Sequence, residues 1–177
     1  MIFLRHPTPE VASGTCYGRT DLDIAEIGLE QIASALRDTP PLTRIIASPA
    51  LRCRKLALSL AERDGIEPVF EERLWEMDMG EFEGMLWKDI PRDKSEIWFT
   101  DPENLPTPGG ESFADVRRRV SEAVEEHLGS DTATTGFVCH AGPIRAMWMH
   151  WEGLTFRQAF DRTPQYATPV RILPPAR

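Results

Sequence analysis

Basic side chains follow three apolar segments of the sequence, each near the point where the segment ends. Arg5 and His6 follow the run MIFL, Arg52 lies within about one turn of the run RIIA, and His140 comes directly after GFVC. Two guanidinium groups and two imidazoles suit a phosphate dianion, which carries about −1.5 to −2 charges at neutral pH. If the three segments are neighbouring strands, the four side chains face one pocket at the edge of a sheet. The pattern therefore predicts a site for a small phosphorylated molecule.

The sequence also offers a nucleophile and a proton source for chemistry at phosphorus. A neutral histidine can attack phosphorus and form a covalent phospho-enzyme. The departing alkoxide then needs a carboxylic acid close to the bridging oxygen. Glu76, which lies between Trp75 and Met77, is our candidate for this acid, and a solvated surface residue is the alternative. We expect the other acidic residues of this region to be solvated at the surface: Glu71, Glu72, Glu81 and Glu83.

Apolar periodicity and turn residues predict alternating strands and helices along the chain. We expect strands at residues 1–4, 44–47, 68–71, 136–139 and 170–173, and helices at 25–37, 50–64, 93–99, 112–128, 142–151 and 156–162. This alternation indicates an α/β fold with a largely parallel sheet. No domain boundary is visible, so we expect a single domain of residues 1–177. The proline-rich stretch at about 85–112 is interpreted as an excursion that caps the site.

Composition excludes several classes of protein. The net charge of −8 argues against a nucleic-acid partner, because binding to phosphate backbones needs an excess of basic residues. The three cysteines include no CxxC pair, which favours reduced thiols and a cytoplasmic location over a disulfide framework. No apolar run approaches the ~18 residues of a membrane span, and we expect no membrane partner. No pair of histidines or acids has ligand spacing on one element, so we expect no metal.

Five motifs in a fixed order give the sequence a family resemblance. LRH, SPALR, LWEMDMGEFEG, PGGES and CHAG together span most of the chain and resemble those of the histidine phosphatase superfamily. The resemblance implies the phosphoglycerate mutase-like fold, a three-layer α/β sandwich in which helices flank a mostly parallel central sheet. It implies no cofactor, and a small phosphate monoester as substrate.

The resemblance also assigns a role to each matching residue of the site. It implies that His6 is the phosphohistidine nucleophile and Glu76 the proton donor, while Arg5, Arg52 and His140 hold the phosphoryl group. It further implies substrate-binding positions in the CYG, PGGES and CHAG motifs: Tyr17, Gly18, Glu111, Ser112 and Ala141. Ser112 or Glu111 is also expected to cap the helix that follows.

Within the family, the segment HPTPEVASGTCYGRTD is most similar to α-ribazole phosphatases of cobalamin synthesis. That similarity indicates α-ribazole 5′-phosphate as the substrate. A broad-specificity sugar or nucleotide phosphatase and a phosphoglycerate mutase are the alternatives of the same fold. Two positions depart from the family pattern: Pro7 replaces the usual glycine, and neither Glu10 nor Val11 supplies the usual asparagine.

Two further hypotheses compete with the phosphohistidine enzyme. CHAGPIR, from Cys139 to Arg145, matches the C-x5-R pattern of cysteine-dependent phosphatases, although this hypothesis would leave His6 and Glu76 without a task. The second is a phosphate-binding module that has lost catalysis, with Pro7 as the cause. Trp87 and Trp98 in the capping excursion either stack on a base-like leaving group or pack in the core. The oligomeric state stays open, with a homodimer as one alternative.

Overall fold

A five-stranded sheet forms the centre of the protein in the computed structural model, which describes residues 1–128 and 134–175. The strands in chain order are β1 (Ile2–Arg5), β2 (Arg44–Ala47), β3 (Val69–Phe70), β4 (Thr135–Cys139) and β5 (Pro169–Arg171). Their spatial order is β3-β2-β4-β1-β5, and β5 alone of these strands pairs antiparallel with its neighbour. The predicted α/β fold with a mostly parallel sheet is thereby confirmed.

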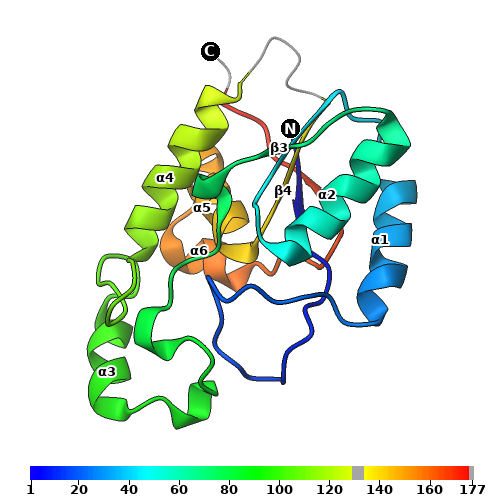
Figure 1. The fold of residues 1–177 in the computed structure, drawn as a ribbon. Coiled ribbons are helices and arrows are strands. Elements are labelled where there is room, and N and C mark those ends of the chain that lie inside the picture. The colour runs from blue at the N-terminus through cyan, green and yellow to red at the C-terminus, as the bar shows by residue number, and fades with distance from the viewer. Residues whose placement is uncertain (129–133, 176–177) are drawn as a thin grey trace.

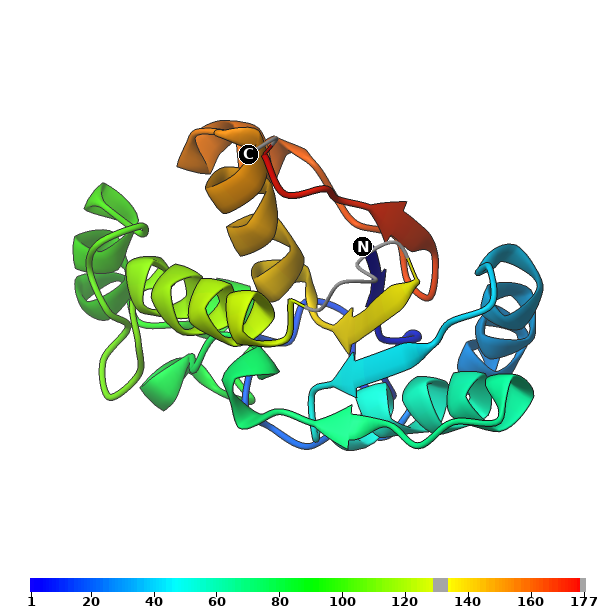
Figure 2. The same cartoon turned by 90° about the horizontal axis from the view of Figure 1, so that it is seen from above.

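Helices cover both faces of this sheet and give three layers (Figures 1 and 2). One layer contains α1 (Ile27–Asp38) and α2 (Leu51–Asp64), and the other contains α4 (Phe113–Glu126), α5 (Ala141–Glu152) and α6 (Phe156–Asp161). Alternate side chains of a strand enter opposite cores. Leu4 and Val138 pack with α1 and α2, while Phe3 and Phe137 pack with α4 and α5. The sheet is therefore buried on both sides, as its apolar strands require.

The remaining chain between β3 and α4 is built of short elements. Three 3-10 helices, η1 (Glu72–Leu74), η2 (Gly80–Phe82) and η3 (Trp87–Asp89), precede the helix α3 (Arg92–Thr100). Figure 1 shows α3 at the periphery, away from the sheet and below the N-terminal end of α4. None of the described helices is both long enough and apolar enough to cross a membrane.

Two predicted helix ends can be compared with hydrogen bonds in the structure. The helix predicted at residues 25–37 begins at Ile27, and the Ala25 N–H before it donates to the Thr8 carbonyl (2.9 Å). Ser112 caps α4 by accepting from the Asp115 N–H, and the Asp115 carboxylate accepts in return from the Ser112 N–H. This reciprocal capping box decides between Ser112 and Glu111 as the cap.

The order of the strands explains how residues far apart in sequence reach one site. Strand β4 lies between β1 and β2, with Arg5 opposite Cys139 and Ala47 opposite Val138. Because the three strands are parallel, the residues that follow them emerge at the same edge of the sheet. His6, Ser48 and His140 are these residues, and they form the floor of the site.

Candidate active site

His6 and His140 lie side by side at the carboxyl edge of the sheet. Their ring centroids are 5.1 Å apart with the planes inclined at 60°. Both side chains are buried, and the His6 N–H donates to the Cys139 carbonyl at 2.9 Å, which ties the end of β1 to the end of β4. The predicted pairing of two imidazoles from different strand ends is present in the structure.

The ring of His6 is held in an orientation that suits a nucleophile. Its Nδ1 atom lies 2.7 Å from the carbonyl oxygen of Pro7, so a proton on Nδ1 is donated to that oxygen and the lone pair of Nε2 remains free. Burial, and next the positive charge of Arg52, lower the pKa of His6 well below its usual value. His6 is therefore neutral at pH 7. The proline that departs from the family pattern supplies the carbonyl that orients the nucleophile.

Two arginines flank the histidine pair and keep unpaired donors. The Arg5 guanidinium lies 3.8 Å from the centre of the Tyr166 ring and donates to the Pro164 carbonyl at 3.2 Å. Arg52 is fully buried and donates to the carbonyls of Gly18 and Thr20, each at 2.8 Å. Among the described residues, neither buried Nε–H of the two arginines has a partner. Buried donors without partners are costly, and an oxyanion would satisfy them.

His140 is fixed from three sides. Its Nε2 atom lies 2.9 Å from the Ser48 hydroxyl and 3.6 Å from the Cys53 sulfur, and its ring stacks on Trp75 at 5.9 Å between centroids. Burial, and then the charge of Arg52, lower the pKa of His140 well below its usual value. A neutral, oriented imidazole can donate one hydrogen bond to a phosphoryl oxygen.

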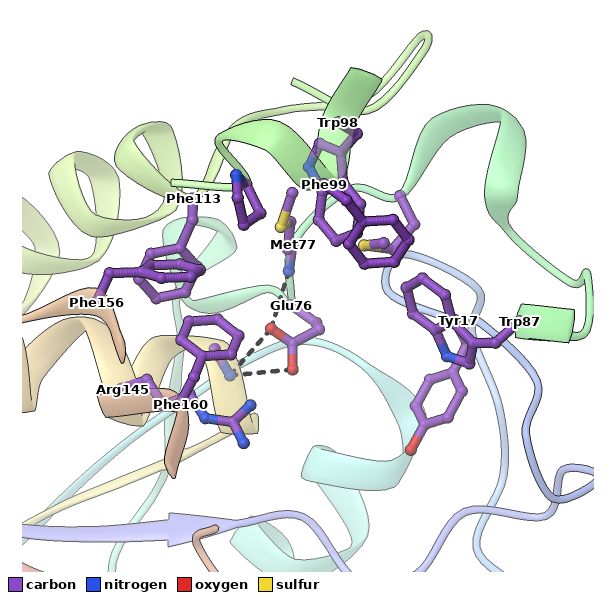
Figure 3. A pocket seen from close by; sticks show the side chains of 13 residues that line it. Tyr17, Glu76, Met77, Trp87, Trp98, Phe99, Phe113, Arg145, Phe156 and Phe160 are labelled. Atoms are coloured by element: carbon purple, nitrogen blue, oxygen red, sulfur yellow. Dashed lines mark hydrogen bonds between the residues drawn. The ribbon is translucent and has the colours of Figure 1, made fainter. Parts of the chain in front are cut away.

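Glu76 is held beside the histidines by the first turn of α5. Both of its carboxylate oxygens lie 3.1 Å from the backbone nitrogen of Gly142, as the dashed lines of Figure 3 mark. A Cβ atom at Gly142 would come within 2.1 Å of Glu76 Oε1, so only glycine permits this approach. Arg119 donates to the Glu76 carbonyl at 3.0 Å and to that of Trp75 at 2.8 Å, which fixes the backbone of the segment.

A cavity of about 320 Å³ opens next to Glu76. Figure 3 shows Arg145 and Phe160 on one side of the carboxylate, with Trp87 and Tyr17 on the other. Most of the lining is aromatic or apolar, and these residues are Met77, Met79, Trp87, Trp98, Phe99, Pro102, Phe113, Phe156 and Phe160. Both tryptophans that the sequence left undecided line this cavity. The arrangement combines an anion site with an apolar space on the side of the candidate acid.

The substrate-binding positions implied by the resemblance lie in different environments. Tyr17 lines the cavity, and its hydroxyl lies 3.5 Å from that of Tyr166. Ala141 is buried in the first turn of α5, next to Gly142.

Glu111 and Ser112 have partners away from the cavity lining. The Glu111 carboxylate accepts from Arg119 at 2.6 and 3.0 Å and from the Asp78 N–H at 2.8 Å. The Ser112 hydroxyl bonds to Asp115 in the capping box. Substrate contact by these two side chains stays a prediction, and their observed contacts are structural.

The sequence did not single out Tyr166 or Ser48, which border the site, and it indicated Arg145 only as the arginine of the C-x5-R pattern. Tyr166 lies in the irregular segment before β5, Ser48 follows β2 directly, and Arg145 projects from α5 into the cavity wall. Ser48 belongs to the SPALR motif and Arg145 to the segment CHAGPIR, so both stood beside recognised residues. Tyr166 carries no local signal, because its position depends on the antiparallel return of the chain to β1.

The thiol of Cys139 does not have the environment of a nucleophile. The side chain is fully buried in β4, and this burial raises the pKa of the thiol well above its usual value. A catalytic cysteine needs the opposite, an accessible thiol with a lowered pKa. The geometry thus contradicts the cysteine-dependent alternative. Within residues 1–128 and 134–175, no three histidine, cysteine or acidic side chains are grouped so as to hold a metal ion.

Comparison with known proteins places this site in a family. The model of the histidine phosphatase superfamily (branch 1) matches residues 1–174, and the chain belongs to that superfamily. It is 32% identical to phosphoserine phosphatase 1 of Hydrogenobacter thermophilus over 84% of the chain and 74% of that protein. It is 30% identical to glucosyl-3-phosphoglycerate phosphatase of Mycolicibacterium vanbaalenii over 83% of the chain and 71% of that protein. The protein is a phosphoric monoester hydrolase.

Solved structures support the same fold. The complex of mycobacterial glucosyl-3-phosphoglycerate phosphatase with inorganic phosphate superposes with a TM-score of 0.80 at 22% identity, covering 94% of this chain and 84% of that one. One further sequence relative is much longer than this chain. The chain is 30% identical to a bifunctional protein of Mycobacterium tuberculosis, and the match covers 42% of the length of that protein.

Proposed function

We propose that the protein hydrolyses a small phosphomonoester through a phosphohistidine at His6. In the first step, His6 Nε2 attacks phosphorus, the bond from phosphorus to the leaving oxygen breaks, and protonated Glu76 gives its proton to that oxygen. Arg5, Arg52 and His140 stabilise the charge of the transferring phosphoryl group. The hydrogen bond between His6 Nδ1 and the Pro7 carbonyl is the observation that carries this proposal, because it leaves Nε2 as the free nucleophile.

The second step returns the enzyme to its starting state. The Glu76 carboxylate takes a proton from water, the water oxygen attacks phosphorus, and the bond from phosphorus to His6 Nε2 breaks. Inorganic phosphate leaves and Glu76 is again protonated. A single carboxyl group beside the phosphate pocket serves both steps, since it gives a proton in the first step and takes one in the second.

For the substrate, we propose α-ribazole 5′-phosphate. The aromatic lining of the cavity supports a leaving group that carries a flat, apolar base, which can stack against indole and phenyl rings. We further propose that the excursion at about 85–112 acts as the cap of this site, since Trp87, Trp98, Phe99 and Pro102 come from it. A cytoplasmic location is supported by three buried cysteines that are free thiols.

A second candidate is a phosphorylated metabolite that carries a carboxylate, such as phosphoserine. It is favoured by Arg145, whose Nε donates to the Arg162 carbonyl while its two terminal nitrogens have no hydrogen-bond partner in the described part of the chain. A guanidinium in a cavity wall is suited to a carboxylate. The names of the phosphoserine and glucosyl-3-phosphoglycerate phosphatases are consistent with this class of substrate.

A panel of kcat/KM values in excess EDTA tests the function and the substrate together. We expect turnover of all phosphomonoesters offered, with α-ribazole 5′-phosphate preferred over glucose 6-phosphate, AMP and phosphoserine. A preference for phosphoserine that is lost in Arg145→Met would favour the second candidate. Isomerisation of phosphoglycerate that depends on 2,3-bisphosphoglycerate would indicate a mutase. Stoichiometric vanadate binding without any turnover would indicate an inactive module.

A further inference from the structure

Glu83 accepts hydrogen bonds from several backbone N–H groups and is not the solvated surface acid that its sequence context predicted. One carboxylate oxygen accepts from the N–H groups of Gly18 (3.0 Å) and Thr20 (3.2 Å) and from the Thr20 hydroxyl. The other accepts from the N–H groups of Arg19 (2.7 Å) and Met79 (3.3 Å). Burial raises the pKa of Glu83, but these hydrogen bonds outweigh it and the pKa is lowered. Glu83 is therefore ionised at neutral pH.

The peptide segment that Glu83 holds also holds Arg52. The carbonyl of Gly18 accepts from one terminal nitrogen of Arg52 and the carbonyl of Thr20 from the other, each at 2.8 Å. The N–H groups of residues 18–20 thus bond to a carboxylate while two carbonyls of the same segment bond to a guanidinium. The Gly18 carbonyl and the Arg19 N–H belong to one peptide, so Glu83 polarises that peptide and strengthens the carbonyl as an acceptor. The Thr20 carbonyl is positioned by the bonds of the Thr20 N–H and hydroxyl to Glu83.

Gly18 makes this arrangement sterically feasible. A Cβ atom at this position would lie 1.8 Å from the Met77 carbonyl oxygen and 2.9 Å from Glu83 Oε1. The segment therefore packs directly against the irregular stretch that continues from Glu76. A side chain here would move the segment away from Glu83 and, with it, the two carbonyls that hold Arg52.

We propose that Glu83 is a positioning residue for the phosphate site, which acts on bound phosphate through residues 18–20 and Arg52. The proposal rests on the proposed function only in that Arg52 binds the phosphoryl group. Arg52 has no ion-pair partner among the described residues, so its alignment depends on these two carbonyls, that of Gly18 polarised by Glu83 and that of Thr20 positioned by it. Loss of the Glu83 charge weakens the Gly18 carbonyl as an acceptor, loosens the Thr20 backbone and releases the guanidinium from its fixed direction.

Glu83→Gln is the first test, with vanadate as the probe. The glutamine keeps the shape of the side chain but replaces one accepting oxygen by an NH₂ group, which faces N–H donors. We expect the inhibition constant of vanadate to rise at least about tenfold. Glu81→Gln is the matched control, because Glu81 is exposed and pairs with Lys94 at the surface. An unchanged inhibition constant in a folded Glu83→Gln protein would overturn the proposal.

A double-mutant cycle with Arg52→Lys separates positioning from a general loss of stability. Lysine has no planar fork to bond both carbonyls, so in the Arg52→Lys background we expect Glu83→Gln to have little further effect on vanadate binding. An equal fold-change in both backgrounds would contradict action through Arg52. If Glu83→Gln fails to fold, Thr20→Val takes its place, because it removes only the hydroxyl donor to Glu83. It should also raise the inhibition constant of vanadate, but by less than the value expected for Glu83→Gln. An unaltered inhibition constant in folded Thr20→Val would then contradict the proposal.

The readout does not depend on the phosphohistidine itself. Equilibrium binding of vanadate can be measured in His6→Ala as well as in the wild type. If His6→Ala retained full turnover, the proposed function would fail while the effect of Glu83 on anion binding could still hold. The two proposals are thus tested independently.

Discussion

The two carboxylate oxygens of Glu76 share the backbone nitrogen of Gly142, each at 3.1 Å. This contact joins the candidate proton donor to the helix that begins directly after His140. It also places a carboxyl group at the positive end of the α5 dipole. The acid and the phosphate pocket are therefore positioned by the same turn of backbone.

Gly142→Ala should displace the Glu76 carboxyl group from its place beside the phosphate pocket. The new Cβ would lie 2.1 Å from Glu76 Oε1, so the carboxyl group must move. We expect a loss of about 10²-fold in kcat for alkyl phosphates, the size typical of displaced general acids. Gly153→Ala, at the other end of α5, is the control: its φ of 68° makes alanine costly for stability, but kcat should not change. Equal activity in Gly142→Ala and the wild type would contradict the role of Glu76.

Glu76→Gln should reduce turnover according to the leaving group. An alkoxide needs the proton that glutamine cannot supply, whereas p-nitrophenolate departs without it. Burst kinetics with p-nitrophenyl phosphate should therefore show near-normal formation of the phospho-enzyme and slow hydrolysis of it. A uniform loss of both phases for aryl and alkyl substrates would argue for a purely structural role of Glu76.

The buried histidines make stability depend on pH. Because burial and Arg52 lower the pKa of both His6 and His140, the folded protein stays unprotonated at a pH where the unfolded chain already binds protons. Stability is therefore lost as the pH falls below the unfolded pKa of about 6.5, by on the order of 1 kcal/mol for each histidine over the first pH unit. Urea unfolding in phosphate-free buffer measures this slope. His6→Asn should make it shallower, and an unchanged slope would mean that His6 takes up its proton at the same pH in the folded and unfolded states.

Ser112→Ala tests whether this residue caps a helix or binds substrate. Loss of the capping hydrogen bonds to Asp115 should lower the free energy of unfolding by about 1 kcal/mol, with KM unchanged. Ser121→Ala, a half-buried position on the same helix whose hydroxyl donates to the Arg118 carbonyl, should have no destabilising effect. A raised KM without a change in stability would restore the substrate-binding role implied by the family resemblance.

Trp87→Ala tests the aromatic cavity. This side chain is 42% exposed and lines the cavity, so its removal should spare the fold. We expect kcat/KM for α-ribazole 5′-phosphate to fall about tenfold, as the loss of a stacking contact implies, while that for glucose 6-phosphate stays constant. Ile97→Ala is the control, since Ile97 is exposed on α3 and lies outside this cavity. An equal fold-decrease in kcat/KM for both substrates would show that Trp87 acts on folding or on the phosphate pocket.

Sequence patterns sufficed for the elements and for the residues at the strand ends. His6, Arg52 and His140 were predicted together because each closes or follows an apolar run, and parallel strands bring such positions to one edge. The same reasoning failed for Glu83, whose neighbours Glu81 and Gly84 suggest an exposed turn. Its burial depends on residues 18–20 folding back over it, and this contact between segments over 60 residues apart has no local signal. Tyr166 was missed for the same reason.

Isolation of the phospho-enzyme tests most directly whether His6 is the nucleophile. Rapid acid-free quenching of a reaction with excess p-nitrophenyl phosphate, followed by peptide mass spectrometry, locates the added phosphoryl group. We expect one phosphoryl group on the peptide that contains His6, stable in alkali, and none in His6→Ala. A phosphoryl group on Cys139, or full single-turnover activity in His6→Ala, would contradict this role of His6.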